Sequence, residues 1–166
     1  MIARLQSQRG FALIELLAAI VMINIGILAI LLTLNSGQVT LRRSAELSTA
    51  SVVADKHMER FRAHQYSAIY LDTTSLGGTD ATYQGDTAYS ATQVSQACSP
   101  LTVQCRPSQT VTGPDGRTYR IDTYIVFKTP TGGAGGDPVK QATVVVRRST
   151  GSAAVARTVS IFGEKF

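Results

Sequence analysis

The chain opens with ten residues of mixed polarity, MIARLQSQRG, and then becomes apolar over residues 11–35. No position between Leu16 and Leu34 is charged. As an α-helix with a rise of about 1.5 Å per residue, the run is roughly 36 Å long, while the hydrocarbon layer of a bilayer is about 30 Å thick. The pattern therefore predicts a membrane-spanning helix over residues 11–35.

Beyond this run the apolar residues form a one-sided stripe. They recur at spacings of three and four, at Leu47, Ala50, Ala54, Met58 and Phe61. No proline or glycine lies between Gln38 and Ser75 to end a helix. A stripe of this kind needs a surface to pack against. We therefore expect an amphipathic helical half over residues 36–70 that continues the apolar helix and packs on the domain that follows.

From residue 117 the hydrophobic period changes to two. In RTYRIDTYIVFK, alternate residues share one face and predict a half-buried strand: Tyr119, Ile121, Thr123, Ile125 and Phe127. QATVVVRRS and AVARTVSIF predict two further strands, and a short strand near Gln109–Thr112 precedes the turn GPDG. The pattern predicts an antiparallel meander of three or four strands, and the fold class is α+β.

The segment between helix and sheet is rich in Gly, Thr and Asp, as in LDTTSLGGTDATYQGDT. This composition is typical of a loop region, which we place at residues 71–116. With the strands it forms one small β-sheet domain over residues 71–166, which we expect outside the cytoplasm.

One acid, Glu15, interrupts the apolar run near its start. A carboxylate deep in hydrocarbon costs on the order of 3 kcal/mol, so it indicates a function and a cationic partner. The simpler alternative places Glu15 near the interface, where it snorkels to water. The leader also differs from an ordinary secretory signal, because its small residue, Gly10, precedes the apolar run. Two arginines and no acid in the leader predict a cytoplasmic N-terminus, although an arginine pair after the apolar run weakens this asymmetry.

Taken together, these residues carry a resemblance to a known family. RGFALIELLAAI resembles the class III signal peptide of the type IV prepilin superfamily, which includes major pilins, minor pilins and type II secretion pseudopilins. Continuing through SVVADKHMERFRA, the chain is most similar to PilV-like minor pilins and related pseudopilins. The resemblance implies a pilin-like ladle, in which a leader peptide at residues 1–10 precedes a long N-terminal helix packed on a small antiparallel sheet.

The resemblance also implies the roles of three residues. A prepilin peptidase would cut between Gly10 and Phe11 and methylate the new amine of Phe11. Glu15 matches the family's glutamate, which pairs with the N-terminal amine of a neighbouring subunit during assembly. Many major pilins have a proline inside the apolar helix, and this chain has none before Pro100. That departure favours a minor subunit or a pseudopilin.

The expected function is a minor pilin, a structural subunit of a type IV pilus (a fimbrium), and not an enzyme. The alternatives are a type II secretion pseudopilin and a competence-pilus subunit with weak DNA binding; roles in adhesion and secretion both stay open. The implied partners are other pilin or pseudopilin subunits, prepilin peptidase and the membrane, which the chain would cross once. Before assembly the protein would reside in the inner membrane, and afterwards in a pilus or pseudopilus at the cell surface.

Charge is unevenly distributed along the chain. The formal net charge is +5; residues 63–116 sum to −3 and residues 117–166 to +5. A basic sheet can attract nucleic acid. However, Arg147 and Arg148 are adjacent on a predicted strand and point to opposite faces, and no aromatic ladder accompanies them. Nucleic acid is therefore the less favoured partner, and any binding is expected to be weak, non-specific and salt-sensitive.

Little in the sequence indicates catalysis, a cofactor or a metal. Cys98 and Cys105 suit a structural disulfide worth about 2–3 kcal/mol, with free thiols as the alternative. His57 and His64 would lie about 10 Å apart on a helix, too far to share an ion, and are expected to face solvent or the domain. DATYQGD only weakly resembles a calcium loop, because it has two carboxylates. We predict no catalytic, cofactor or metal site.

Overall fold

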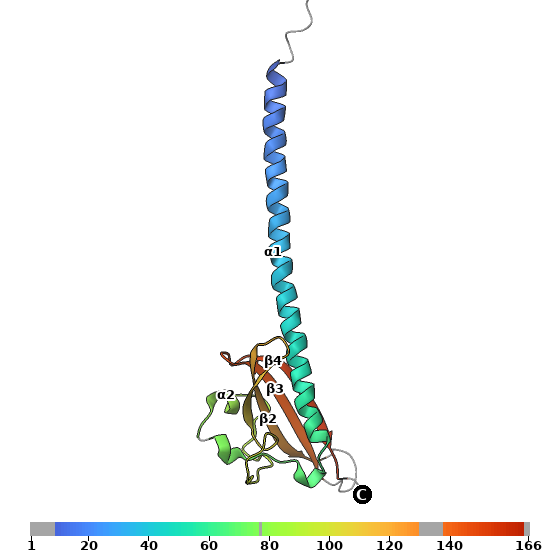
Figure 1. The fold of residues 1–166 in the computed structure, drawn as a ribbon, viewed down its shortest axis with the longest axis vertical. Helices are drawn as coiled ribbons and strands as arrows, with labels where there is room; N and C mark the ends of the chain where they lie inside the picture. The colour runs from blue at the N-terminus through green and yellow to red at the C-terminus, as the bar shows by residue number, and fades with distance from the viewer. Residues whose placement is uncertain (1–8, 77, 130–137, 165–166) are drawn as a thin grey trace, which may run out of the picture. The chain divides into compact units, whose positions relative to one another are not determined.

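A computed structural model describes residues 9–76, 78–129 and 138–164, so most of the predicted leader lies outside the described residues. The elements follow the order α1, two short 3-10 helices, a one-turn helix α2, and strands β1 to β4 (Figure 1). The chain divides between Ser44 and Ala45 into two compact units, which are treated separately below. The division falls inside α1.

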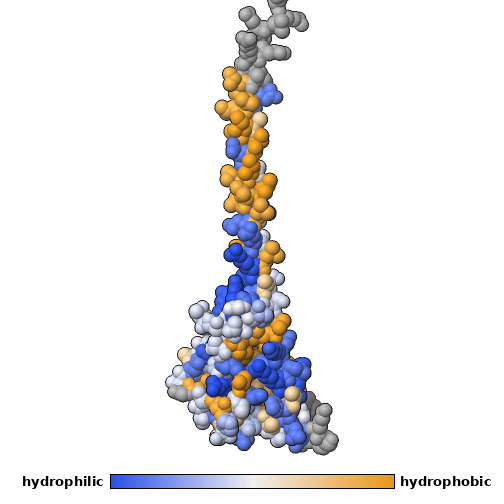
Figure 2. All heavy atoms as spheres, in the orientation of Figure 1, coloured by the Kyte–Doolittle hydropathy of each residue, from blue (hydrophilic) through white to orange (hydrophobic). Residues whose placement is uncertain are grey.

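The first unit is the apolar part of helix α1, Arg9–Arg62. Its large apolar side chains from Leu13 to Leu41 are about half exposed or more, because no other element of this unit covers them. Figure 2 shows these side chains gathered along the upper part of the helix. Among the described residues, α1 is the one helix long and apolar enough to cross a membrane. Length and composition therefore agree with the membrane-spanning segment predicted from the sequence.

Helix α1 ends earlier than expected, at Arg62 and not near residue 70. The amide of His64 donates to the carbonyl of Phe61 (3.1 Å), which tightens the last turn, and a 3-10 helix follows at Tyr66–Ala68. Beyond it, Ile69 and Leu71 are buried in the core. The chain must turn back to place these two side chains, so the lack of proline and glycine alone did not extend the helix.

The second unit contains a four-stranded antiparallel sheet in the order β1-β2-β3-β4. Its strands are β1 (Ser108–Thr112), β2 (Thr118–Lys128), β3 (Val139–Arg148) and β4 (Ala154–Phe162). Every pair of neighbours is consecutive in the chain, so the predicted meander is confirmed. The last turns of α1 pack on one face of this sheet, which confirms the α+β class.

Four of the five predicted stripe residues of α1 are buried against the sheet: Ala50, Ala54, Met58 and Phe61. They join a core with Ile121, Ile125 and Val144 from the strands. The prediction was wrong for Leu47, which is 46% exposed. Its neighbour Glu46 is buried instead, because Arg148 pairs with it. The spacing of apolar residues cannot predict the burial of a charged residue in an ion pair.

The half-buried interpretation of β2 was also wrong, because residues 121–125 are buried on both faces. The second face is covered by the predicted loop region, which contains a 3-10 helix at Thr73–Leu76 and the helix α2 at Ala81–Gln84. From α2, Tyr83 stacks on Tyr124 with ring centroids 4.4 Å apart, and its hydroxyl donates to the carbonyl of Thr123 (2.6 Å). A disulfide joins Cys98 and Cys105 in the same region.

Candidate functional site

The residues of the predicted processing and assembly site lie together at the start of α1. Gly10 and Phe11 are already helical, and Glu15 is one turn further along with its side chain exposed. Within the described side chains Glu15 has no ion-pair partner. Every other residue from Phe11 to Leu41 is uncharged. The chain thus presents a single isolated carboxylate on an apolar helix.

Two other polar side chains of the apolar helix bond within their own helix. Asn24 Nδ2 donates to the carbonyl of Ile20 (2.8 Å), and Thr33 Oγ1 donates to that of Ala29 (2.9 Å). Amide and hydroxyl groups can do this because they have a hydrogen to donate. An ionised carboxylate only accepts, and carbonyls facing along a helix offer it nothing. Glu15 therefore requires a donor or a cation from another molecule or from water.

A second cluster of charges lies on the face of the sheet opposite α1. Asp122 is fully buried and accepts hydrogen bonds from Ser108 Oγ (2.7 Å), Arg120 Nε (2.8 Å) and Arg147 Nε (3.0 Å). Arg120 also pairs with Asp80 (2.6 Å). Each buried charge in this cluster therefore meets an opposite charge, as burial in a low dielectric requires.

The acids that complete this cluster come from the predicted loop region. Asp80 caps the N-terminus of α2 by accepting the amides of Thr82 and Tyr83, both at 3.0 Å. Burial opposes ionisation of Asp80, but the amide of Tyr83 and the guanidinium of Arg120 prevail and hold its pKa below the usual value. Asp86, at the other end of DATYQGD, pairs with two arginines of the sheet. Both carboxylates of the weak calcium motif are thus engaged by protein groups.

These pairs also account for most of the basic charge expected on the sheet. Five arginines of residues 117–166 form ion pairs with acids of the same unit: Arg117, Arg120, Arg147, Arg148 and Arg157. As expected for adjacent strand residues, Arg147 meets Asp122 and Arg148 meets Glu46 from separate parts of the unit. The arginines are therefore not a free basic surface, and the physical case for a nucleic-acid partner is weaker than the net charge suggests.

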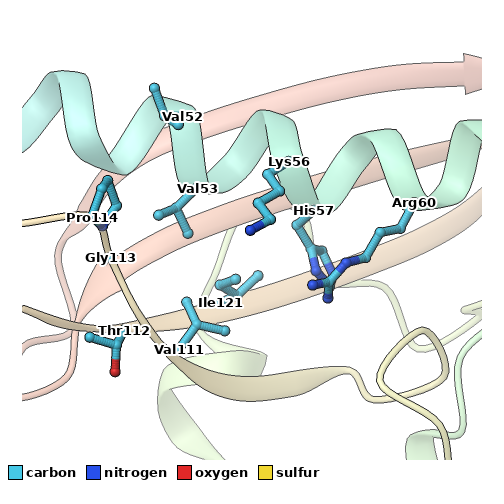
Figure 3. A pocket seen from close by; sticks show the side chains of 10 residues that line it. All are labelled: Val52, Val53, Lys56, His57, Arg60, Val111, Thr112, Gly113, Pro114 and Ile121. Atoms are coloured by element: carbon cyan, nitrogen blue, oxygen red, sulfur yellow. The ribbon is translucent and has the colours of Figure 1, made fainter. Parts of the chain in front are cut away.

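A groove of about 370 Å³ opens between α1 and the β1 edge of the sheet. It is lined by Val52, Val53, Lys56, His57 and Arg60 of α1, by Val111 and Thr112 of β1, by the turn residues Gly113 and Pro114, and by Ile121 of β2. In Figure 3 the side chains of Lys56, His57 and Arg60 extend from the helix toward the strands. The groove thus combines apolar walls with cationic groups.

The two histidines lie in different environments. His64 is exposed, whereas His57 is buried beside the groove, with its Nε2 3.2 Å from Thr123 Oγ1. Burial and, to a smaller extent, the positive charge of Arg60 together lower the pKa of His57 to about 4. His57 is therefore a neutral core residue at neutral pH. In the part of the chain that the structure describes, no group of three or more His, Cys, Asp or Glu is arranged to hold a metal.

Comparison with known proteins gives a match over the N-terminal part of the chain. Residues 5–31 match the family model described as the prokaryotic N-terminal methylation motif. Together with the long apolar helix, this match fits a type IV prepilin-like protein, either a pilin or a pseudopilin. The motif indicates a structural subunit that assembles with other pilin subunits and is processed by prepilin peptidase. No curated protein and no solved structure matched the chain.

The match covers Gly10, Phe11 and Glu15 and stops within the apolar helix, so it does not extend to the second unit. The buried charge cluster and the groove were both missed by sequence reasoning. The pairing of an acidic segment with a basic one was visible in the uneven charge distribution, but nothing in the sequence placed Asp80 or Asp86 beside their arginines.

Proposed function

We propose that the protein is a minor pilin, a structural subunit of a type IV pilus. In this proposal prepilin peptidase cleaves between Gly10 and Phe11 and methylates the amine of Phe11. Before assembly the apolar helix spans the inner membrane once, with the sheet domain outside the cytoplasm. The subunit then joins the fibre through this helix.

The observation that carries the proposal is Glu15, the fifth residue after the processing site. Its carboxylate has no ion-pair partner among the described side chains, whereas Asn24 and Thr33 of the same helix bond to their own backbone. The amine of a neighbouring subunit's Phe11 would provide the positive charge that can pair with Glu15. An unpaired charge is expensive in a low dielectric, and a pair there is strongly attractive. Assembly thus supplies a cationic partner that Glu15 does not have among the described residues of its own chain.

A type II secretion pseudopilin is the second candidate. The methylation motif and the proline-free apolar helix suit it equally well. Crosslinking within isolated native fibres, followed by identification of the neighbouring subunits, distinguishes pilus from pseudopilus.

The proposal is tested by Glu15→Leu in cells with active prepilin peptidase. The mature mass should still begin at methylated Phe11 and the protein should remain in the membrane, because the processing site is intact and the helix has become more apolar. Its amount in isolated fibres should fall at least about tenfold, since leaving one partner of a buried pair uncompensated costs about 3–5 kcal/mol.

Asn24→Leu is the matched control. It also makes the apolar helix more hydrophobic, but Asn24 bonds within its own helix, so incorporation into fibres should be unchanged. Wild-type fibre levels for Glu15→Leu would show that Glu15 has no pairing role. An N-terminus that still carries Met1 in the wild-type protein would rule out prepilin processing.

A further inference from the structure

The groove between α1 and β1 contains cations without anions. Lys56 and Arg60 lie one turn apart on α1, and both line the groove. Neither has an ion-pair partner among the described residues, although five arginines of the sheet do. No aspartate or glutamate lines the groove. The site therefore has an uncompensated positive charge.

The other flank of α1 does not supply the missing acid. Asp55 accepts a hydrogen bond from Thr158 of β4 (3.0 Å), so it faces the opposite edge of the sheet. Glu59 pairs with Arg62 at 3.1 Å. Asp55 and Glu59 thus each have another partner, and neither lines the groove.

The walls of the groove are apolar and partly open. Val53 and Ile121 are buried within it, Val111 is half-buried, and Val52 is 55% exposed. A purely polar anion would leave these apolar walls in contact with water. A purely apolar occupant would remove Lys56 and Arg60 from water without a counter-charge, which is costly. The occupant that satisfies both conditions combines apolar side chains with at least one carboxylate.

The turn at the end of the groove packs closely on α1. A Cβ at Gly113 would lie 2.7 Å from the ring of Tyr119 and 3.1 Å from Cγ2 of Thr49 on α1. Only glycine permits this close approach of the turn to the helix. The end of the groove is therefore held in place, and an occupant does not have to order it first.

We propose that this groove binds an acidic, apolar segment of a different subunit in the same fibre. The inference rests on the proposed function, because it needs an assembly. A different subunit is favoured over a second copy because, in that function, a minor subunit assembles with other pilin subunits. In addition, most described acids of this domain are already engaged, and Glu164 is the one without an ion pair or hydrogen bond among the described residues. Among the described residues of the unit, Glu46, Asp80, Asp86, Asp115 and Asp122 are in ion pairs. Asp72 accepts hydrogen bonds from Thr74 and the amide of Cys98.

The test places a photocrosslinking amino acid at Val52, or separately at Pro114, in the full chain in cells that produce fibres. The crosslinked peptide is identified by mass spectrometry. We expect a segment of another pilin-like subunit that contains Asp or Glu next to apolar residues. Lys56→Glu combined with Arg60→Glu should lower the crosslink yield at least about tenfold, since the reversed charges would repel the acid of the partner.

Lys128→Glu is the matched control. It reverses an exposed cation of β2 outside the groove and should leave the yield unchanged. The sharpest result is rescue: replacing the crosslinked acid by lysine in the partner should restore the yield with Lys56→Glu. A crosslink to a second copy, to a segment without acid, or with a yield indifferent to Lys56 and Arg60 would overturn the inference.

The same samples separate the two levels of the proposal. If the unmodified chain is absent from fibres, the proposed function fails. If the chain with either photocrosslinker is present in fibres and no groove crosslink forms, the function stands and this inference fails.

Discussion

The two faces of the sheet are covered in different ways. On the α1 side, apolar residues of helix and strands meet in a core that includes Met58, Phe61 and Ile125. On the other side, the segment from residue 72 to 105 lies over a fully buried aspartate, two arginines and stacked tyrosines. The face covered by α1 is held mainly by apolar packing, which is not directional. The other face is held mainly by hydrogen bonds and ion pairs, which are directional.

This difference has an energetic consequence. The stability contributed by apolar packing falls gradually as atoms are removed, in proportion to the lost contact and the cavity left behind. A buried charge network instead depends on each partner, because removing one leaves another charged and buried. The loop-covered face should therefore be the more sensitive of the two to a single substitution.

The largest effect is expected for Asp122→Ala, which leaves Arg120 and Arg147 without their shared acceptor. The free energy of unfolding should fall by about 3–5 kcal/mol. Urea unfolding of the detergent-solubilised chain can be followed by tyrosine fluorescence, since all six tyrosines lie in the second unit and no tryptophan is present. Asp55→Ala is the control: it removes an exposed acid with one hydrogen bond and should change stability by less than about 1 kcal/mol.

The double variant of Asp122→Ala with Arg147→Met sharpens the same point. It should destabilise the protein by less than the sum of the two single substitutions, because each single substitution already removes the same Asp122–Arg147 pair. Strict additivity would mean that the two side chains are not coupled.

On the helix-covered face, Met58→Ala should lower the free energy of unfolding by about 3 kcal/mol, within the range for deleting a fully buried methionine side chain. Leu47→Ala, made on the same helix at a half-exposed position, should have a small effect of about 0.5 kcal/mol. The same fluorescence measurement checks both. An equal loss for Leu47→Ala would mean that its side chain is covered in solution.

The smallest effect concerns His57, the titratable group of the helix-covered face that faces Thr123. Its pKa is lowered to about 4 in the folded chain, by burial and by Arg60, against about 6.5 unfolded. The unfolded state therefore binds the proton first, and stability is lost as pH falls from about 6.5 toward 4. Between pH 7 and 5 this amounts to about 2 kcal/mol. His57→Gln should flatten this slope, which urea unfolding at a series of pH values measures.

The helix-covered face could be predicted from the sequence because its information is local. Residues three or four apart on a helix, and two apart on a strand, share a face. The burial of Ala54, Met58 and Ile121 could therefore be predicted from their spacing. The same reasoning failed at two places. Leu47 is exposed because Glu46 beside it is buried in an ion pair, and α1 ends early because Ile69 returns to the core.

The other face could not be predicted, because its partners are distant in the chain. Asp80 and Arg120 are 40 residues apart, and Asp86 and Arg147 are 61 apart. The Gly- and Thr-rich composition around Tyr83 also predicted a loop, whereas the structure has a one-turn helix there that holds the Tyr83 ring in the core.

The same reason separates the two candidate sites. Gly10, Phe11 and Glu15 lie in one short stretch, so the resemblance of that stretch to prepilins was enough to propose their roles. The groove, by contrast, exists only once the turn at Gly113 packs on α1.

The meander has a consequence for how the domain forms. Each strand pairs with the next one along the chain, so the sheet can grow by successive hairpins, each of which closes a short loop. The contacts of α1 with the sheet join residues about 60 to 100 positions apart, as in His57 with Thr123 and Glu46 with Arg148. Because chain closure over long separations is slow, we expect the hairpins to form early and the docking of α1 to be the late step. During that interval the buried stripe of α1 would be exposed while its N-terminal part is already held in the bilayer.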